Sequence, residues 1–135
     1  MAALSGYAAV VLILVAASLP LGYRLRAHKR AAPQSKPLRL HVAVGLATAF
    51  IAFVHTLIAL PSLGSPEAVG AGLLPLASAG CAFFLLVAHA GIGLQLRDPR
   101  LRDRAQKRRT HTMTAIAIVG AVSAHVFGLL SASNH

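Results

Sequence analysis

Charged residues are scarce in this sequence: only 12% of its 135 residues are Asp, Glu, Lys or Arg, and just three of these are acidic. A water-soluble domain carries roughly a quarter of its residues as charged side chains. Hydrophobic residues make up 56% of the chain, and the mean hydropathy is +0.69. This composition excludes an ordinary soluble fold and predicts that lipid surrounds most of the chain.

The apolar runs contain no acid and the sequence has a single thiol. Glu67, Asp98 and Asp103 all lie between apolar runs, so no carboxylate pair is available inside them. Cys81 is the one cysteine, which excludes a disulfide within the chain. The sequence also has no nucleophile–base set and no phosphate-binding glycine loop. We therefore do not expect a self-contained enzyme.

Four apolar runs define the predicted fold. Each is close to the roughly 20 residues that a helix needs to cross the hydrocarbon core, and in lipid only a helix satisfies its own backbone groups. The first run is read as a retained helix, because a secretory signal carries its cations before the apolar run and here they follow it. The prediction is one domain over 1–135, an all-α integral membrane four-helix bundle with helices at about 4–22, 38–60, 71–96 and 110–131.

The cations predict an orientation. All 13 Lys and Arg residues fall within 24–39 and 97–109, and the connection at 61–70 has none. Short basic loops stay in the cytoplasm, so both termini are expected on the other side, in a bacterial inner membrane. The net charge of +10 does not indicate nucleic acid, because neither basic segment contains an aromatic residue. Anionic lipid headgroups or an acidic partner are the expected contacts.

Histidines are the ionisable residues within the predicted helices, where such groups are costly and indicate function. His41 and His55 lie on the second predicted helix, and His111 and His125 lie on the fourth. Each pair is fourteen residues apart, which is about 21 Å of rise and returns the side chain to the same helix face. Both helices run outwards from a basic loop, so His41 matches His111 in depth and His55 matches His125. Two imidazole pairs are therefore expected, one in each leaflet.

Small residues accompany these histidines. Gly45 lies on the histidine stripe of the second helix, and alanines and threonines fill much of the stripe on the fourth. Small side chains let another group approach a helix backbone closely. A flat macrocycle bound between two axial imidazoles has this requirement.

The segments LRLHVAVGLATAFIAFVHTLIAL (38–60) and RRTHTMTAIAIVGAVSAHVFGLL (108–130) resemble the ligand helices of diheme membrane cytochromes b, a group that includes ferric-reductase-like transmembrane domains and the b-type subunits of bacterial oxidoreductases. The resemblance implies two non-covalent b haems, with His41, His55, His111 and His125 as iron ligands, and electron transfer across the membrane. The sequence departs from this group because it shows no flavin- or nicotinamide-binding domain. It also has no C-x-x-C-H motif for covalent haem attachment.

Four further residues are candidates for contacting the cofactors. Arg39, Arg108 and Arg109 lie at the level of the inner haem and are candidates for its propionates, although arginines at a membrane boundary can also be simple topology anchors. His89 on the third helix could bond a propionate, line a quinone pocket, replace one of the four ligands, or simply bond a neighbouring helix.

The predicted function is transmembrane electron transfer, as a subunit or partner of a larger redox complex or a quinone-linked system. A quinone is a further candidate cofactor. Two alternatives stay open: histidine-based binding or transport of a transition metal, and a structural membrane subunit. The second alternative leaves the doubled histidine spacing unexplained.

Overall fold

Four long helices make up the computed structural model, which describes residues 2–29, 31–32, 34–70 and 72–132. Each of the four is long and apolar enough to cross a membrane. A 3₁₀ turn, η1 (Leu60–Ser62), and a short helix, α3 (Pro66–Gly70), lie in the connection between the second and third long helices. The predicted all-α, four-helix membrane architecture is confirmed, with long helices α1 (Ala2–Ala27), α2 (Lys36–Ala59), α4 (Leu73–Gln95) and α5 (Arg104–Ala132).

Two helices are longer than predicted because an apolar run marks the hydrocarbon and not the end of the helix. α1 passes through Pro20 and carries Arg24 and Arg26 in its last turn. α5 begins at Arg104, so part of the second basic segment is helical. The predicted start of the third helix, 71, lies outside the described residues. α4 begins after Gly72, whose φ of 82° lies in the left-handed region that favours glycine.

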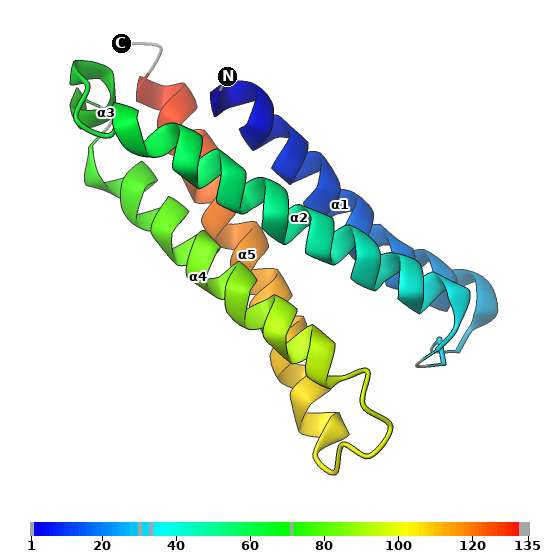
Figure 1. Cartoon of the computed structure of the whole chain (residues 1–135). Helices are drawn as coiled ribbons and strands as arrows, with labels where there is room; N and C mark the ends of the chain where they lie inside the picture. Colours follow the sequence, from blue (N-terminus) through cyan, green and yellow to red (C-terminus); the bar gives the residue numbers. More distant parts are fainter. Residues whose placement is uncertain (1, 30, 33, 71, 133–135) are drawn as a thin grey trace.

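The long helices form two hairpins, α1 with α2 and α4 with α5, and α2 also packs against α4. Figure 1 shows that both termini and α3 lie at one end of the molecule, while the connections 28–35 and 96–103 lie at the other. We call this second end the basic end. The hairpins lie close together near the termini and splay apart towards the basic end (Figure 1). α2 and α5 both run away from the basic end, as the sequence predicts.

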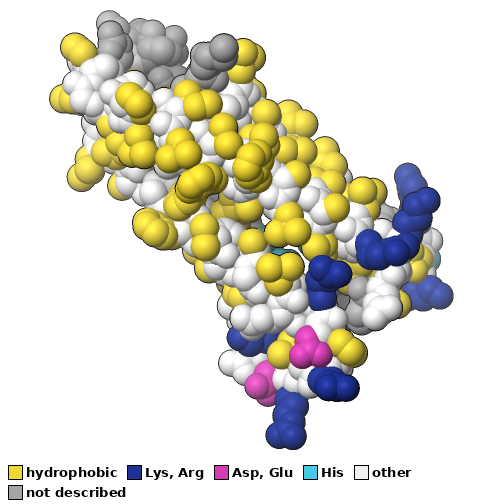
Figure 2. Space-filling model, viewed as in Figure 1, with side chains coloured by type: hydrophobic (Ala, Val, Ile, Leu, Met, Phe, Trp, Pro, Cys, Tyr) yellow, Lys and Arg dark blue, Asp and Glu magenta, His cyan; other side chains and the backbone are white. Residues whose placement is uncertain are grey.

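The surface has the distribution expected of a chain surrounded by lipid. Hydrophobic side chains cover the length of the helices in Figure 2, while Lys and Arg gather at the basic end. Large apolar side chains point outwards: Phe84 is 72% exposed and Phe127 is 71% exposed. Such exposure in water would be an aggregation liability, whereas in hydrocarbon it carries no cost.

The small interior lies midway along the helices. Thr48 of α2 is only 2% exposed and Ile118 of α5 only 4% exposed, and Leu86 of α4 is also buried. The Thr48 hydroxyl donates to the Val44 carbonyl of its own helix at 2.8 Å, so the buried hydroxyl donor is satisfied. Thr48 lies midway between His41 and His55, and Ile118 lies midway between His111 and His125. Packed side chains therefore separate two levels of histidine.

Candidate functional site

Five half-buried histidines occupy two levels of the helix assembly. The inner layer, nearer the basic end, contains His41 of α2, His89 of α4 and His111 of α5. The outer layer contains His55 of α2 and His125 of α5. Helix geometry places the two layers about 21 Å apart along each helix.

His41 and His111 come together in the inner layer across the gap between the hairpins. Their ring centroids are 6.1 Å apart and their planes are nearly perpendicular, at 89°. Metal–imidazole bonds are about 2.0–2.1 Å long, so two nitrogens ligating one metal from opposite sides lie about 4 Å apart, with the ring centroids somewhat farther. The spacing of this pair is of that size.

The orientation of His41 depends on a proline in the neighbouring helix. The Nδ1 of His41 lies 2.8 Å from the carbonyl oxygen of Ala16 in α1. In a regular helix that carbonyl would accept the N–H of residue 20, but Pro20 has no N–H to donate. Because a carbonyl only accepts, Nδ1 of His41 is the donor, and the neutral ring keeps its lone pair on Nε2. This is the tautomer that an Nε2-ligating histidine requires.

His89 is held in the same way by α5. Its Nδ1 lies 2.8 Å from Oγ1 of Thr114, whose own hydroxyl hydrogen donates to the His111 carbonyl at 3.0 Å. The threonine oxygen therefore accepts, and His89 also carries its proton on Nδ1. Its ring stacks on that of His111, with centroids 3.7 Å apart and planes 13° from parallel. The structure thus places His89 in the inner layer.

His111 differs from the other two inner histidines. Its Nδ1 is buried and has no hydrogen-bond partner among the described residues. A metal-ligating histidine almost always donates its other ring N–H to an acceptor. His41 and His89 meet this requirement and His111 does not. The inner layer therefore contains two oriented histidines, and the third, His111, contacts both of their rings.

The outer histidines are each anchored within their own hairpin. His125 Nδ1 lies 2.8 Å from the carbonyl oxygen of Pro75 in α4, which makes Nδ1 the donor here too. His55 Nδ1 lies 3.1 Å from the hydroxyl oxygen of Ser5 in α1. Each ring of the predicted outer pair is therefore oriented by a neighbour in its own hairpin. Their pairing across the two hairpins stays a prediction.

Two glycines make room for histidine rings. A Cβ added to Gly6 of α1 would lie 3.2 Å from Cε1 of His55, and one added to Gly93 of α4 would lie 3.1 Å from Cε1 of His111. Both distances are tighter than ordinary contact, so only glycine leaves these rings undisturbed. Gly45, the glycine singled out in the sequence, is different: a Cβ there would meet nothing within 4 Å. Open space beside Gly45 leaves room for another group to approach α2.

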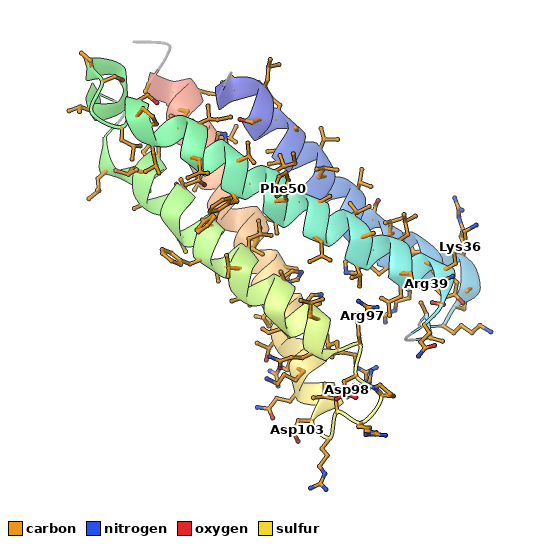
Figure 3. All side chains as sticks on the ribbon, in the orientation of Figure 1. Lys36, Arg39, Phe50, Arg97, Asp98 and Asp103 are labelled. Carbon is orange, nitrogen blue, oxygen red and sulfur yellow. The ribbon has the colours of Figure 1, made fainter. Side chains whose placement is uncertain are left out.

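A cavity of about 540 Å³ lies at the basic end, between the start of α2 and the end of α4. The side chains of Leu38, Val42 and Leu94 form its apolar wall. Its polar side contains Gln34, Arg39, Arg97 and Asp98. Figure 3 shows Arg39 and Arg97 at the open end of the gap between the hairpins. Arg108 and Arg109 are exposed on α5 and do not line this cavity.

The contact of His41 with His111 can be compared with the ligation of a haem. A haem iron takes only two axial ligands from the protein, so pairs of histidines matter. The inner layer contains such a pair, and among the described residues no group of three or more His, Cys, Asp or Glu side chains could hold a metal ion. His41 and His111 would hold an inner haem. His55 and His125 would hold an outer one.

Several residues of the site were not predicted from the sequence. Pro20 lies inside α1 and frees the acceptor for His41. Thr114 contacts the Nδ1 of His89, and the Pro75 carbonyl accepts from His125. Arg97 lines the same cavity as Arg39. A proline inside a helix leaves the carbonyl four residues before it without its usual donor, and the sequence does contain this signal. It identifies a site only when the helix that supplies the new donor is known.

No family model matches this chain, and no curated protein or solved structure matches it either.

Proposed function

We propose that this protein transfers electrons across a membrane through two bis-histidine b-type haems, as the membrane subunit or partner of a larger redox complex or a quinone-linked system. The observation that carries the proposal is the contact of His41 and His111, which come from two different hairpins and have ring centroids 6.1 Å apart. Four apolar helices supply the membrane setting.

The hydrogen bonds of the histidines support the proposal. His41 and His125 each donate from Nδ1 to a backbone carbonyl of the neighbouring helix, at 2.8 Å in both cases. Such bonds fix the tautomer and ring orientation of a ligand and raise its basicity. A histidine that only filled space in the membrane would also need a hydrogen bond, but either ring nitrogen could donate it. Here Nδ1 is the donor in both cases, which leaves Nε2 available as a ligand.

When bound, haem supplies one-electron redox chemistry at iron. The protein's part is to hold the two axial nitrogens, to exclude water and to set the potential through hydrogen bonds and burial. The buried side chains of Thr48 and Ile118 separate the two histidine layers. Arg39 at the inner end is the candidate partner for a propionate.

The proposal is tested by the visible spectrum. The protein is produced in haem-replete cells, purified in detergent and reduced, and its haem-to-chain ratio is expected to be about two. His41→Ala is expected to lose the inner haem and His55→Ala the outer one, each leaving a ratio of about one. His28→Ala is the matched control, because His28 lies in the connection between α1 and α2. A colourless native protein would overturn the proposal, and a native ratio near one would restrict it to the inner layer.

A further inference from the structure

The cavity at the basic end is positively charged and its arginines are uncompensated. Among the described residues, neither Arg39 nor Arg97 forms an ion pair, although both line the same cavity from different hairpins. Asp98 is the one acid of the lining, and its Oδ1 accepts the Arg100 backbone N–H at 2.9 Å. Two guanidinium groups against one carboxylate leave a net positive charge, which favours an anion.

The wall that carries Arg97 is a built feature of the fold. The Arg104 guanidinium donates to the carbonyl of Leu96 at 2.9 Å and also to the carbonyl of Asp98. These two bonds satisfy carbonyl groups at the end of α4 and hold the turn on either side of Arg97. The position of Arg97 beside the start of α2 therefore depends on local bonds and not on a freely moving loop.

We infer that this cavity binds the phosphate headgroup of an acidic phospholipid between Arg39 and Arg97. Arg39 lies two residues from His41, about 3 Å along α2, and so lies at the boundary between the helix interior and the basic connections. Basic pockets between membrane helices at such a boundary bind acidic headgroups. Arginine provides a planar fork that matches phosphate oxygens.

The apolar half of the cavity favours a lipid over free phosphate. Leu38, Val42 and Leu94 form a wall beside the two arginines. A soluble anion leaves such a wall in contact with water, whereas an acyl chain covers it, and covering apolar surface is favourable.

The test titrates the full-length protein in detergent with dioleoyl-phosphatidylglycerol and, separately, with dioleoyl-phosphatidylcholine, and counts bound lipid by native mass spectrometry. We expect the anionic lipid to bind more tightly. Arg39→Gln and Arg97→Gln should each weaken its binding by roughly five-fold, the effect of one basic side chain near an anionic surface. Asp98→Asn, which keeps the oxygen that accepts the Arg100 N–H, should strengthen binding.

Arg102→Gln is the matched control, because Arg102 is an exposed arginine of the same connection that does not line the cavity. Equal weakening by Arg102→Gln would mean that general surface charge attracts the lipid, and this would overturn the inference. Arg39→Lys and Arg97→Lys keep the charge and should retain part of the affinity. A circular-dichroism spectrum identical to that of the native chain shows that a variant is folded.

Two further arms separate the possible sources of the anion. Inorganic phosphate in large excess should not displace the lipid; displacement would make the cavity a soluble-anion site and overturn the inference. The titration is run on haem-free and haem-replete protein. If Arg39→Gln lowers the haem content but leaves phosphatidylglycerol binding unchanged, the arginines serve haem propionates and the lipid assignment is wrong. Lipid binding by colourless protein would support this inference while the proposed function fails.

Discussion

The imidazole rings of His89 and His111 lie face to face, with centroids 3.7 Å apart and planes 13° from parallel. Both rings are at the level of His41, whose ring centroid is 6.1 Å from that of His111. His89 has its Nδ1 bonded to Thr114, while the Nδ1 of His111 has no partner among the described residues. The stack therefore joins a histidine whose Nδ1 is hydrogen-bonded to one whose Nδ1 is not.

Two variants can show whether His111 is an iron ligand and His89 the ring that supports it. If His111 ligates the inner haem, His111→Ala should lower the haem-to-chain ratio from about two to about one, whereas His89→Ala should leave it at about two and broaden the spectrum. The reason is that loss of the stacked ring frees His111 to rotate without removing its nitrogen. Haem content is measured by the pyridine haemochrome assay. The reverse pattern would identify His89 as the ligand opposite His41.

Pro20 should act on the inner haem from the neighbouring helix. Pro20→Ala supplies an N–H that competes with His41 for the Ala16 carbonyl, so the bond to His41 weakens and the ligand becomes less basic. A less basic ligand stabilises ferric iron less, and the midpoint potential of the inner haem should rise. We expect the midpoint potential to rise by less than about 60 mV, which is the shift for a tenfold change in a one-electron equilibrium.

An optical redox titration measures this shift. Pro99→Ala is the control, because Pro99 lies in the connection between α4 and α5 and should leave both potentials unchanged. A fall in potential on Pro20→Ala, or equal shifts in the two variants, would contradict the role given to the Ala16 carbonyl.

Gly93 should be required for the position of His111. The Cβ of Gly93→Ala would lie 3.1 Å from Cε1 of His111, so the ring must move by a few tenths of an ångström. We expect altered or reduced inner-haem absorbance. Gly91→Ala, on the same helix, meets nothing within 4 Å. It should keep the native spectrum and stabilise the helix by up to about 1 kcal/mol. Identical spectra for the two variants would show that His111 is not held at this glycine.

Gly128 should be required for the packing of α5 on α4. A Cβ there would lie 2.6 Å from Cγ of Pro75, closer than real Cβ contacts allow. Overpacking of this kind costs about 1–3 kcal/mol, more than the gain in helix propensity from alanine. Gly128→Ala should therefore lower the thermal unfolding midpoint in detergent, and Gly120→Ala, whose Cβ meets nothing within 4 Å, should not. The Pro75 carbonyl also accepts a hydrogen bond from Nδ1 of His125. Gly128→Ala should therefore change the absorbance of the proposed outer haem as well as the unfolding midpoint.

The sequence by itself determined that this protein has four membrane-spanning helices, that the histidines of α2 and α5 share matching depths, and that His41 and His111 form a pair. These are consequences of local hydropathy and of the helix period, which decide the length of a helix and the face on which its residues lie. The tertiary structure alone decided that His89 stacks on His111, that Pro20 frees an acceptor for His41, and that Arg97 and Arg39 line one cavity. These relationships depend on the rotation and tilt of each helix, which are set by packing against its neighbours and not by its own sequence.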